Sequence, residues 1–592
     1  MNPMKKSISL VLALLFYVSI LPWSAGAVPP NASFNTTRTN DLITRAPWVD
    51  VRSDNAVING SDTRSYLQIS IDRMVAAGGE VFLPQGVYSV AKPPGSSYVL
   101  TGYSNMKLRG VPGKTIIKLM SADGDCSIFG SSSFVDNVSI DGVTFDGNKS
   151  VVSAVNTSGL LFPNVQKINV TNSVFRNFTL DAALLGETTL AGDVYFYGNK
   201  FSNTNGNGVR AYHIKRLHVI NNTFDGFVKS SVDTNPSATF DNSAEVKISW
   251  NTINNGAAWT AGYSTLSLLG DKIDVIGNTI VGGGAIVVHS TYTRTIGNYK
   301  IALNTVDNSV ANAIDVNQDT NTKISVVLNT LTGFVGSGVS VVLWDNAATP
   351  TRETIIALNT IEEGSGTYTW TNEPASIKLV GAANVKVALN TIKNPRFAGI
   401  EVAGNAADIV LDDNDIFGHK GQAPTDTTTR WGAPIILIDQ GGAIRRVTVQ
   451  NNNIYNYLTA FTPDPYNPFA SGIVLYGVSS DNTAISDVLV KNNTIRTGNG
   501  PAIYSSYTTN SIIEGNRSTG YLMYPFAGSN NPGLQYNTLI SDAIPSSDNT
   551  YYLGENTGAF RSWKGITLKD TINGKHYKVT IDNGVVTPTA LD

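Results

Sequence analysis

The sequence predicts an all-β protein: a single-stranded right-handed parallel β-helix with an N-terminal capping helix and a small C-terminal β unit. Three observations lead to this fold class. A short phrase centred on asparagine returns along most of the chain, apolar residues alternate with polar ones around it, and helical periodicity is absent between its copies. Short strands recurring at a fixed period are typical of a solenoid.

The asparagine phrase reads Trp-Asn-Thr-Ile at 250–253 and Leu-Asn-Thr-Ile at 358–361. From its first clear copy to its last weak one the chain covers 338 residues in 12 steps, and the mean step of about 28 residues suits a solenoid. We expect equivalent asparagines to stack in one interior column, each amide bonding to the next. The central residues are Asn199, Asn222, Asn251, Asn278, Asn304, Asn329, Asn359, Asn390, Asn414, Asn452 and Asn493, with weaker copies at Asn516 and Asn537.

Each repeat contains three short apolar segments. An alternating run such as Val385, Val387 and Leu389 precedes the asparagine, and a Phe, Ile, Val or Leu follows two residues after it. A further run, such as 399–402, leads to the next repeat. Alternation with period two predicts strands with one buried face, so each turn of the solenoid has three strands.

Composition and the N-terminal segment limit the possible partners and location of the protein. The chain has 592 residues and a net charge of −3, which gives no electrostatic reason to expect nucleic acid or an anionic membrane as a partner. Residues 1–27 read as a signal peptide, with Lys5 and Lys6 before an apolar run and a small-residue cleavage site at 25–27. We therefore expect a secreted protein without membrane insertion. The single cysteine, Cys126, excludes an internal disulfide.

The domain order follows from these signals. Residues 28–47 form a polar lead-in, and residues 48–540 form the β-helix, with its cap at 48–90. Within the cap, Asp62 can begin a helix whose apolar residues cover the first coil, and Gly78-Gly79 ends it. The apolar residues expected to face the coil are Leu67, Ile71, Met74 and Val75. Residues 541–592 form the C-terminal β module.

Several phrases near the N-terminus resemble the pectate-lyase-like superfamily, which includes glycoside hydrolase 28-related and tailspike-like proteins. They are Val49-Asp-Val51, the helix ending in Gly79, Val81-Phe-Leu-Pro-Gln-Gly-Val-Tyr88, Leu108-Arg-Gly110 and Val143-Thr-Phe-Asp-Gly-Asn148. The resemblance implies a carbohydrate ligand but no single reaction. The polygalacturonase and mannuronan-epimerase signatures are absent from the sequence, which puts those two activities in doubt.

Candidate site residues come from aligning the strand that precedes each asparagine-containing strand. Its outward positions offer four catalytic candidates, Asp233, His289, Asp315 and Glu401. Asp315 is expected three coils from each of the other two carboxylates. At about 4.8 Å per coil this distance is slightly long for a catalytic pair, so loop residues such as Asp319 or Asp345 also qualify as partners. A neutral imidazole at His289 would be a suitable base.

Substrate-binding candidates line the same expected groove. They are Arg210, Tyr212, Trp259, Asn317, Trp370, Lys378 and Trp431, of which the tryptophans lie in inserts on the approach to the column. Flat aromatic faces suit sugar rings, although they equally suit packing of the inserts onto the solenoid. Similarly, Arg210 beside Asp233, or Lys378 beside Glu401, would form an ordinary surface ion pair.

We predict a polysaccharide-active protein, with hydrolysis favoured because the column offers more acids than bases. A polysaccharide lyase or epimerase acting on uronates is the alternative, and a non-catalytic adhesin or spike is the second. No cofactor is predicted, although Asp412, Asp413 and Asp415 could hold Ca²⁺. The C-terminal phrase Trp563–Leu568 resembles terminal modules of phage tail-type proteins, which implies a role in assembly of a homotrimer or in attachment; it equally suits a plain cap over the last coil.

Overall fold

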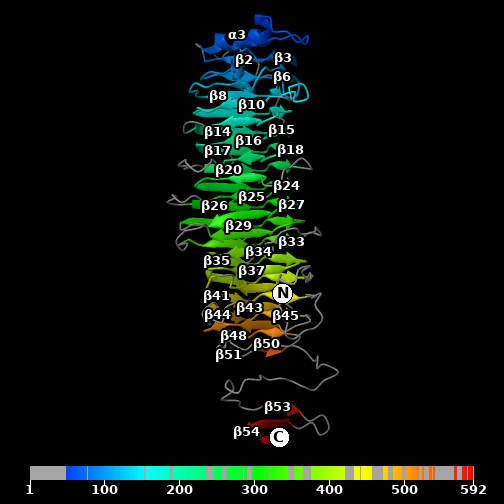
Figure 1. Ribbon diagram of the computed structural model, residues 1–592, viewed down its shortest axis with the longest axis vertical. Coiled ribbons are helices and arrows are strands. Elements are labelled where there is room, and N and C mark those ends of the chain that lie inside the picture. The colour runs from blue at the N-terminus through cyan, green and yellow to red at the C-terminus, as the bar shows by residue number, and fades with distance from the viewer. Residues whose placement is uncertain are drawn as a thin grey trace, which may run out of the picture.

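A computed structural model describes most of the chain from residue 48 onward and forms one long stack of coils (Figure 1). The described residues are 48–75, 78–152, 155–186, 191–234, 245–255, 263–284, 286–289, 297–318, 321–343, 352–363, 375–419, 433–439, 442–455, 471–477, 485–496, 502–518, 523–525, 533–535, 538–539, 566–569, 576–582 and 585–590. The predicted signal peptide and lead-in therefore lie outside the described residues. Among the helices that are described, none has the length and apolar character needed to cross a bilayer.

Three long parallel sheets form the walls of a right-handed parallel β-helix, so the predicted fold class is confirmed. Sheet A contains β1 (Trp48–Asp50), β2 (Glu80–Phe82), β5 (Lys107–Arg109), β8 (Val138–Asp141), β11 (Lys167–Thr171), β14 (Ala191–Tyr197), β17 (Ile214–Ile220), β20 (Glu245–Ser249), β23 (Lys272–Ile276), β26 (Gly297–Ala302), β29 (Thr322–Val327), β32 (Thr354–Ala357), β35 (Ala383–Ala388), β38 (Ala407–Asp412), β41 (Ile444–Gln450), β44 (Ile485–Lys491), β47 (Thr508–Thr509), β48 (Ile512–Glu514) and β51 (Gly533–Gln535).

Sheet B follows the asparagine of each repeat. It contains β3 (Gly86–Ala91), β6 (Thr115–Ser121), β9 (Thr144–Asp146), β12 (Val174–Arg176), β15 (Lys200–Thr204), β18 (Thr223–Phe227), β21 (Thr252–Asn254), β24 (Thr279–Val281), β27 (Thr305–Asp307), β30 (Thr330–Thr332), β33 (Thr360–Glu362), β36 (Thr391–Lys393), β39 (Asp415–Phe417), β42 (Asn453–Tyr455), β45 (Thr494–Arg496), β49 (Arg517–Ser518) and β52 (Thr538–Leu539).

Sheet C carries the candidate site and lies along the middle of the view in Figure 1. It contains β4 (Tyr98–Thr101), β7 (Cys126–Gly130), β10 (Thr157–Phe162), β13 (Ala183–Leu185), β16 (Val209–Ala211), β19 (Val232–Asp233), β22 (Leu266–Leu268), β25 (Ile286–Val288), β28 (Ile314–Gln318), β31 (Val339–Leu343), β34 (Ala375–Val380), β37 (Ala398–Ala403), β40 (Ile435–Ile438), β43 (Ile473–Tyr476), β46 (Ile503–Ser506) and β50 (Met523–Pro525).

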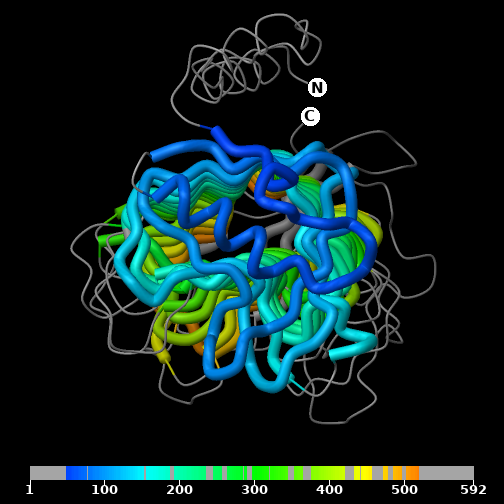
Figure 2. Tube along the Cα trace, turned by 90° about the horizontal axis from the view of Figure 1, so that it is seen from above, coloured from blue at the N-terminus to red at the C-terminus, as the bar shows by residue number. Residues whose placement is uncertain are grey.

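The coils superpose closely when the molecule is viewed along its length (Figure 2). Each strand pairs in parallel with the equivalent strand of the next coil; for example, Leu331 pairs with Ile361, which pairs in turn with Ile392. Their side chains are buried, and the interior is one continuous apolar core. In the earlier coils the same position holds stacked phenylalanine rings, with centroids 5.1 Å apart between Phe175 and Phe201.

The asparagine column is confirmed and lies inside the corner between sheets A and B. Asn359 shows the pattern: its backbone N–H and its Nδ2 both donate to Oδ1 of Asn390, at 3.1 Å and 2.9 Å. Its Nδ2 also donates to the carbonyl of Val326. The same bonds link successive asparagines from Asn199 to Asn516, whereas Asn537 lies outside the described residues. The column therefore provides hydrogen-bond partners for backbone N–H and carbonyl groups where the described coils pass from sheet A to sheet B.

The capping helix is α3 (Arg64–Val75), as predicted for the start of the solenoid. Asp62 accepts a hydrogen bond from the Arg64 backbone N–H at 3.0 Å and so satisfies the first turn, as predicted, although Thr63 is the residue directly before the helix. Leu67, Ile71 and Met74 are buried, but Val75 is 40% exposed, so its predicted place on the covering face is wrong. Val75 follows the buried Met74 by one residue, about 100° around the helix, and so lies on another face of it.

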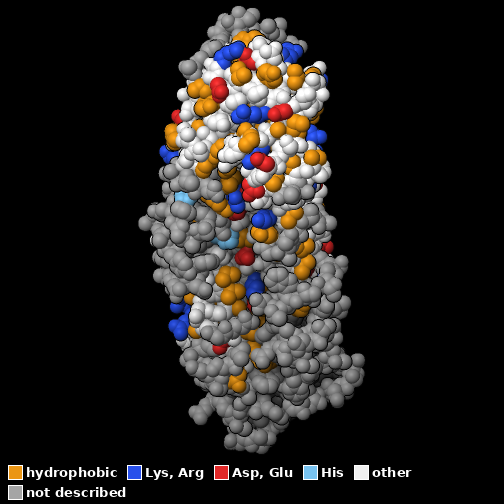
Figure 3. Space-filling model, turned by 45° about the horizontal axis from the view of Figure 1, so that its top comes forward, with side chains coloured by type: hydrophobic (Ala, Val, Ile, Leu, Met, Phe, Trp, Pro, Cys, Tyr) orange, Lys and Arg blue, Asp and Glu red, His pale blue; other side chains and the backbone are white. Residues whose placement is uncertain are grey.

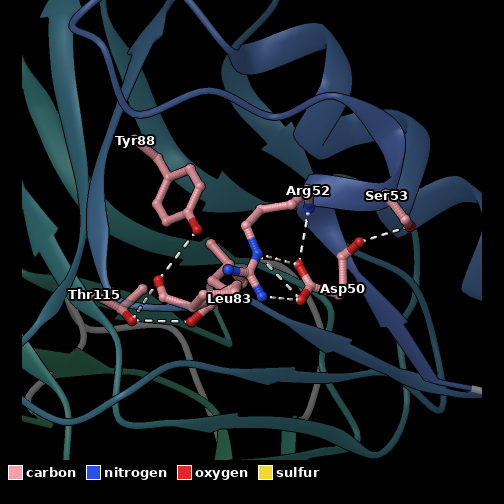
Figure 4. Close-up of polar contacts among 7 residues, drawn as sticks. Asp50, Arg52, Ser53, Leu83, Tyr88 and Thr115 are labelled. Carbon is pink, nitrogen blue, oxygen red and sulfur yellow. Dashed lines mark hydrogen bonds and ion pairs between the residues drawn. The ribbon is translucent and has the colours of Figure 1, made fainter.

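A short 3-10 helix, η1 (Val51–Asp54), joins the first strand to this cap (Figure 4). Asp50 accepts from the Arg52 backbone N–H at 2.9 Å and from its guanidinium, and Ser53 Oγ donates to the Asp50 carbonyl. On the neighbouring turn, Thr115 Oγ1 donates to the Leu83 carbonyl at 2.9 Å. These bonds satisfy the irregular backbone at the closed end of the solenoid.

The C-terminal part contains a three-stranded antiparallel sheet of β53 (Ile566–Lys569), β54 (His576–Asp582) and β55 (Val585–Ala590). Asp582 lies opposite Val585, as expected for strands joined by a two-residue turn. The predicted assignment of residues 541–592 as a separate module stays a prediction.

Candidate active site

The register of sheet C places one outward residue from each of eight successive coils in a single line, here called the polar column. Its members are Arg210, Asp233, Ser267, Val287, Asp315, Ser340, Lys378 and Glu401. The residues before three of the predicted acids, Val232, Ile314 and Ile400, are fully buried in the core. Strand alternation therefore puts the acids on the outward face, as predicted.

His289, Asn317 and Tyr212 belong to the same face but follow the polar column by two residues. His289 comes directly after β25, beside Val287, and Asn317 lies in β28 beside Asp315. Figure 3 shows acidic, basic and histidine side chains in succession along the middle of the molecule. The predicted residues of the described strands thus share one face, whereas Trp259, Trp370, Trp431, Asp319 and Asp345 lie outside the described residues.

Asp315 occupies the centre of the column in an unusual setting for a carboxyl group. Asn312 Nδ2 donates to its Oδ2 at 3.2 Å, and its Oδ1 is buried without a hydrogen-bond partner among the described residues. Burial raises the pKa of Asp315, while the hydrogen bonds from Asn312 and Ser340 only partly oppose the rise. A raised pKa lets a carboxyl group keep its proton to higher pH, as a proton donor requires.

His289 lies one coil before Asp315, and its ring turns toward Ser267. The distance between His289 Nε2 and Ser267 Oγ is 3.3 Å. Burial lowers the pKa of His289, so the neutral imidazole is favoured near pH 7. Strand geometry puts the His289 and Asp315 backbones about 8 Å apart, one coil across and two residues along.

Arg210 is held at the other side of the column by a residue that the sequence analysis missed. Its guanidinium lies 2.9 Å from Oδ2 of Asp181, a carboxylate only 1% exposed. Arg210 also lies over the Tyr212 ring, 5.6 Å from its centre, and the Tyr212 hydroxyl donates to Asp233 at 3.4 Å. Burial raises the pKa of Tyr212 to about 12.

The ion pair seen for Arg210 is thus with Asp181, whereas Asp233 was the partner considered from the sequence. Asp181 precedes β13 by two residues, and Asn207 occupies the same place before β16. The Asn207 amide Nδ2 donates to Asp181 Oδ1 at 3.0 Å. The recurrence of a polar residue two positions before a sheet C strand was the signal that could have revealed Asp181.

Lys378 and Glu401 form the second ion pair of the column, as considered from the sequence. Lys378 Nζ lies 3.6 Å from Glu401 Oε1. Glu401 is only 2% exposed, so this is a buried pair and not the ordinary surface pair that its sequence context suggested. Burial raises the pKa of Glu401, and the Lys378 ammonium opposes the rise.

The separations of the three column carboxylates limit the chemistry they can share. Asp233 and Asp315 are three register steps apart, as are Asp315 and Glu401, or about 14 Å at the backbone at the usual strand spacing. An inverting pair of carboxyl groups lies about 6.5–9.5 Å apart. Within the described strands, therefore, the His289 backbone lies nearer to Asp315 than either carboxylate does, although its ring turns toward Ser267 on the preceding coil.

Beyond Glu401 the same line of positions becomes apolar, which the sequence analysis did not anticipate. The next residues in register are Ile436, Val474 and Tyr504, all at most 3% exposed. They belong to a small apolar cluster separate from the interior core. The polar part of the face is consequently bounded by Arg210 at one end and Glu401 at the other.

The described residues offer no group of three or more His, Cys, Asp or Glu side chains arranged to hold a metal ion. In the stretch considered for Ca²⁺, the Asp412 carboxylate accepts from Asn451 and the Asp415 carboxylate accepts from Asn453, at 2.9 Å and 2.7 Å. These carboxylates are engaged along the stack, and they bind the amides of the following coil.

No family model and no curated protein matches the chain. Solved structures do: the Azotobacter vinelandii mannuronan C-5 epimerase AlgE6 A-module is 15% identical, with 83% of this chain and 98% of that chain covered and a TM-score of 0.22. A Yersinia enterocolitica family 28 exopolygalacturonase is 13% identical, with coverages of 80% and 79% and a TM-score of 0.36. A mutant tailspike protein of E. coli bacteriophage HK620 in complex with a pentasaccharide is 14% identical, with coverages of 84% and 83% and a TM-score of 0.43.

The parallel β-helix that the sequence resemblance implied is shown by the chain's own three long parallel sheets. The chemistry of the present chain rests on its own residues.

Proposed function

We propose that this chain is a glycoside hydrolase that cleaves a polysaccharide lying along the outward face of sheet C, with Asp315 as the general acid. The observation that carries the proposal is the state of the Asp315 carboxyl group. One of its oxygens is buried without a hydrogen-bond partner among the described residues, and burial raises its pKa. A protonated carboxyl group on an outward face is what protonation of a glycosidic oxygen requires.

His289 is the proposed general base. Its neutral imidazole would take a proton from water, and the water oxygen would form the new bond to the anomeric carbon. At the same time Asp315 would give its proton to the glycosidic oxygen as the bond from that oxygen to the anomeric carbon breaks. Attack by this water on the face of the sugar ring opposite the leaving oxygen would invert the configuration. Ser267 orients the imidazole through the 3.3 Å contact.

A lyase or an epimerase is the second candidate, because His289 and Asn317 lie side by side on this face. A neutral imidazole can abstract the proton next to a uronate carboxyl group, and an amide can hydrogen-bond that carboxyl group. Both activities use the same base but differ in their products.

The test is incubation of the full chain with a panel of neutral and uronate polysaccharides. Hydrolysis releases reducing ends without ultraviolet absorbance, and NMR of the first product shows the inverted anomer. Absorbance from an unsaturated uronate product would show that the reaction is β-elimination, and the lyase would replace the hydrolase as the proposed activity. Binding without any product across the panel would leave a carbohydrate-binding protein and refute the enzymatic proposal.

Export and assembly are further proposals, supported by sequence features alone. Lys5, Lys6 and the apolar run after them support secretion, with a mature N-terminus near Val28. Mass spectrometry of the secreted protein checks that terminus. The C-terminal phrase supports a homotrimer, and light scattering of the full chain and of a chain ending at residue 540 checks that assembly.

A further inference from the structure

We propose that the outward face of sheet C selects uncharged glycans and disfavours uronates, because both basic side chains of its polar column are already neutralised by buried carboxylates. The inference rests on the proposed function for the location of the ligand. It adds the substrate class, which neither the fold nor the acid and base residues decide.

Arg210 is committed to Asp181 by a rigid arrangement. The Asp181 carboxylate is almost fully buried, and Asn207 fixes it through its backbone N–H and its amide, at 2.8 Å and 3.0 Å. Arg210 reaches the other carboxylate oxygen at 2.9 Å. A buried carboxylate needs its cation, because an unpaired buried charge is strongly unfavourable. Arg210 therefore has little charge to offer a ligand.

Lys378 faces Glu401 in a looser ion pair at the other end of the column. The carboxylate is 2% exposed, and the ammonium lies 3.6 Å from it. A uronate placed beside Lys378 would bring a second carboxylate next to the buried one. Because like charges repel strongly where water is scarce, that arrangement is unfavourable.

The other carboxyl groups of the column add no positive charge to the face. Asp233 lies between the two ion pairs, and Asp315 is the proposed general acid.

Lys229 is a further basic residue, just before β19. Its ammonium lies 5.3 Å from the centre of the Tyr263 ring. A cation over an aromatic face keeps its charge, so Lys229 is the residue to remove if uronates are found to bind.

A polar group suited to hydroxyls is present on the same face. Asn317 lies two residues beyond Asp315 on β28 and is partly exposed. Its amide both donates and accepts hydrogen bonds, which matches the hydroxyls of a neutral sugar. The face is therefore better equipped for hydroxyl recognition than for charge recognition.

The first experiment measures binding without turnover, using the Asp315→Asn variant of the full chain. Affinity electrophoresis compares polygalacturonate, alginate and hyaluronan with the carboxyl-reduced form of each polymer. Each pair has the same linkages and differs in charge. We expect at least tenfold weaker retention by every uronate form. If a uronate form is retained as strongly as its reduced partner, the proposal is overturned. Loss of this uronate retention in Lys229→Gln would then identify Lys229 as the cation responsible.

The second experiment releases the two cations. In the same Asp315→Asn background, Asp181→Asn combined with Glu401→Gln keeps the side-chain shapes and removes both neutralising charges. We expect retention by the uronate polymers to rise at least tenfold at low salt. The matched control is Asp408→Asn, which releases Arg446 from an ion pair on sheet A instead. An equal rise in the control would mean a general effect of net charge and would overturn the proposal.

The second experiment decides the case in which the first finds no binding to any polymer. A gain in uronate retention confined to the Asp181 and Glu401 variant then supports the proposal, and its absence, with the fold intact by circular dichroism, refutes it. Binding of neutral polymers without hydrolysis by the unsubstituted protein would refute the hydrolase and leave the charge selection standing. The two failures are therefore distinguishable.

Discussion

The asparagine column and the polar column are both lines of side chains running along the solenoid, one residue per coil. They differ in residue type and in hydrogen bonding. In the asparagine column the residue type never changes between Asn199 and Asn516, and each amide donates and accepts along the stack. In the polar column the residue type changes from coil to coil, and oxygens of Asp315 and Glu401 lack hydrogen bonds among the described residues.

The difference separates polar groups that stabilise the fold from polar groups available for chemistry. A satisfied buried network holds the backbone in place, whereas a buried group with an unused oxygen costs free energy. Such a cost is expected where a ligand or a proton completes the arrangement. The comparison can be tested by changing one residue of each column and measuring both stability and activity.

The largest expected effect is that of Asp315→Asn on turnover. Removing the general acid should lower kcat by about 10²–10⁴-fold, the usual contribution of such a group. Because burial raises the pKa of Asp315, the protonated form is favoured in the folded protein, and its stabilisation is lost as pH rises through that pKa. The neutral amide should therefore leave the thermal midpoint at pH 7 unchanged or higher. Full activity in this variant would contradict the assignment.

His289→Gln should lower turnover by about 10²-fold and change the pH profile. The base must be neutral, so activity in the unsubstituted protein falls as pH drops through the lowered pKa of His289, below its ordinary 6.5. The acid must be protonated, so activity falls as pH rises through the raised pKa of Asp315, above its ordinary 3.8. Profiles of kcat/KM check this, and an acidic limb that persists in the variant would remove His289 from the mechanism.

Asn359→Leu should act on stability instead. The change leaves the Asn329 backbone N–H and amide without their acceptor, because both donate to Asn359 Oδ1. An unsatisfied buried group costs about 1–3 kcal/mol, measured as the free energy of unfolding in denaturant. Activity well below the midpoint should be unchanged. Asn254→Leu, at an exposed position on β21, is the matched control and should cost far less.

The smallest effect is expected for Asp408→Asn on the outward face of sheet A. Asp408 pairs with Arg446 at 2.6 Å, but both side chains are about half exposed, at 45% and 55%. Water screens such a pair, so neither the thermal midpoint nor turnover should change measurably. A marked loss of stability would mean that the outer ion pairs also support the stack, and the contrast between the two columns would weaken.

The architecture can be read from local patterns in the sequence. The asparagine phrase, the apolar residue two positions after it and the alternation in the strand before it are local patterns, each readable within a few residues. Because a stacked coil buries the same positions in every turn, these patterns fix which residues point inward. The outward placement of Asp233, Asp315 and Glu401 followed directly from that alternation.

Which of the outward residues act together depends on contacts between coils. Arg210 has a neighbouring coil on each side, and its long side chain can reach a carboxylate in either, so sequence could not choose between Asp233 and Asp181. The choice depends on Asn207, which holds Asp181 in place from one coil away. Burial of Glu401 and the apolar continuation at Ile436 likewise depend on packing across coils. Charge state and partner choice are properties of that packing, which no local pattern contains.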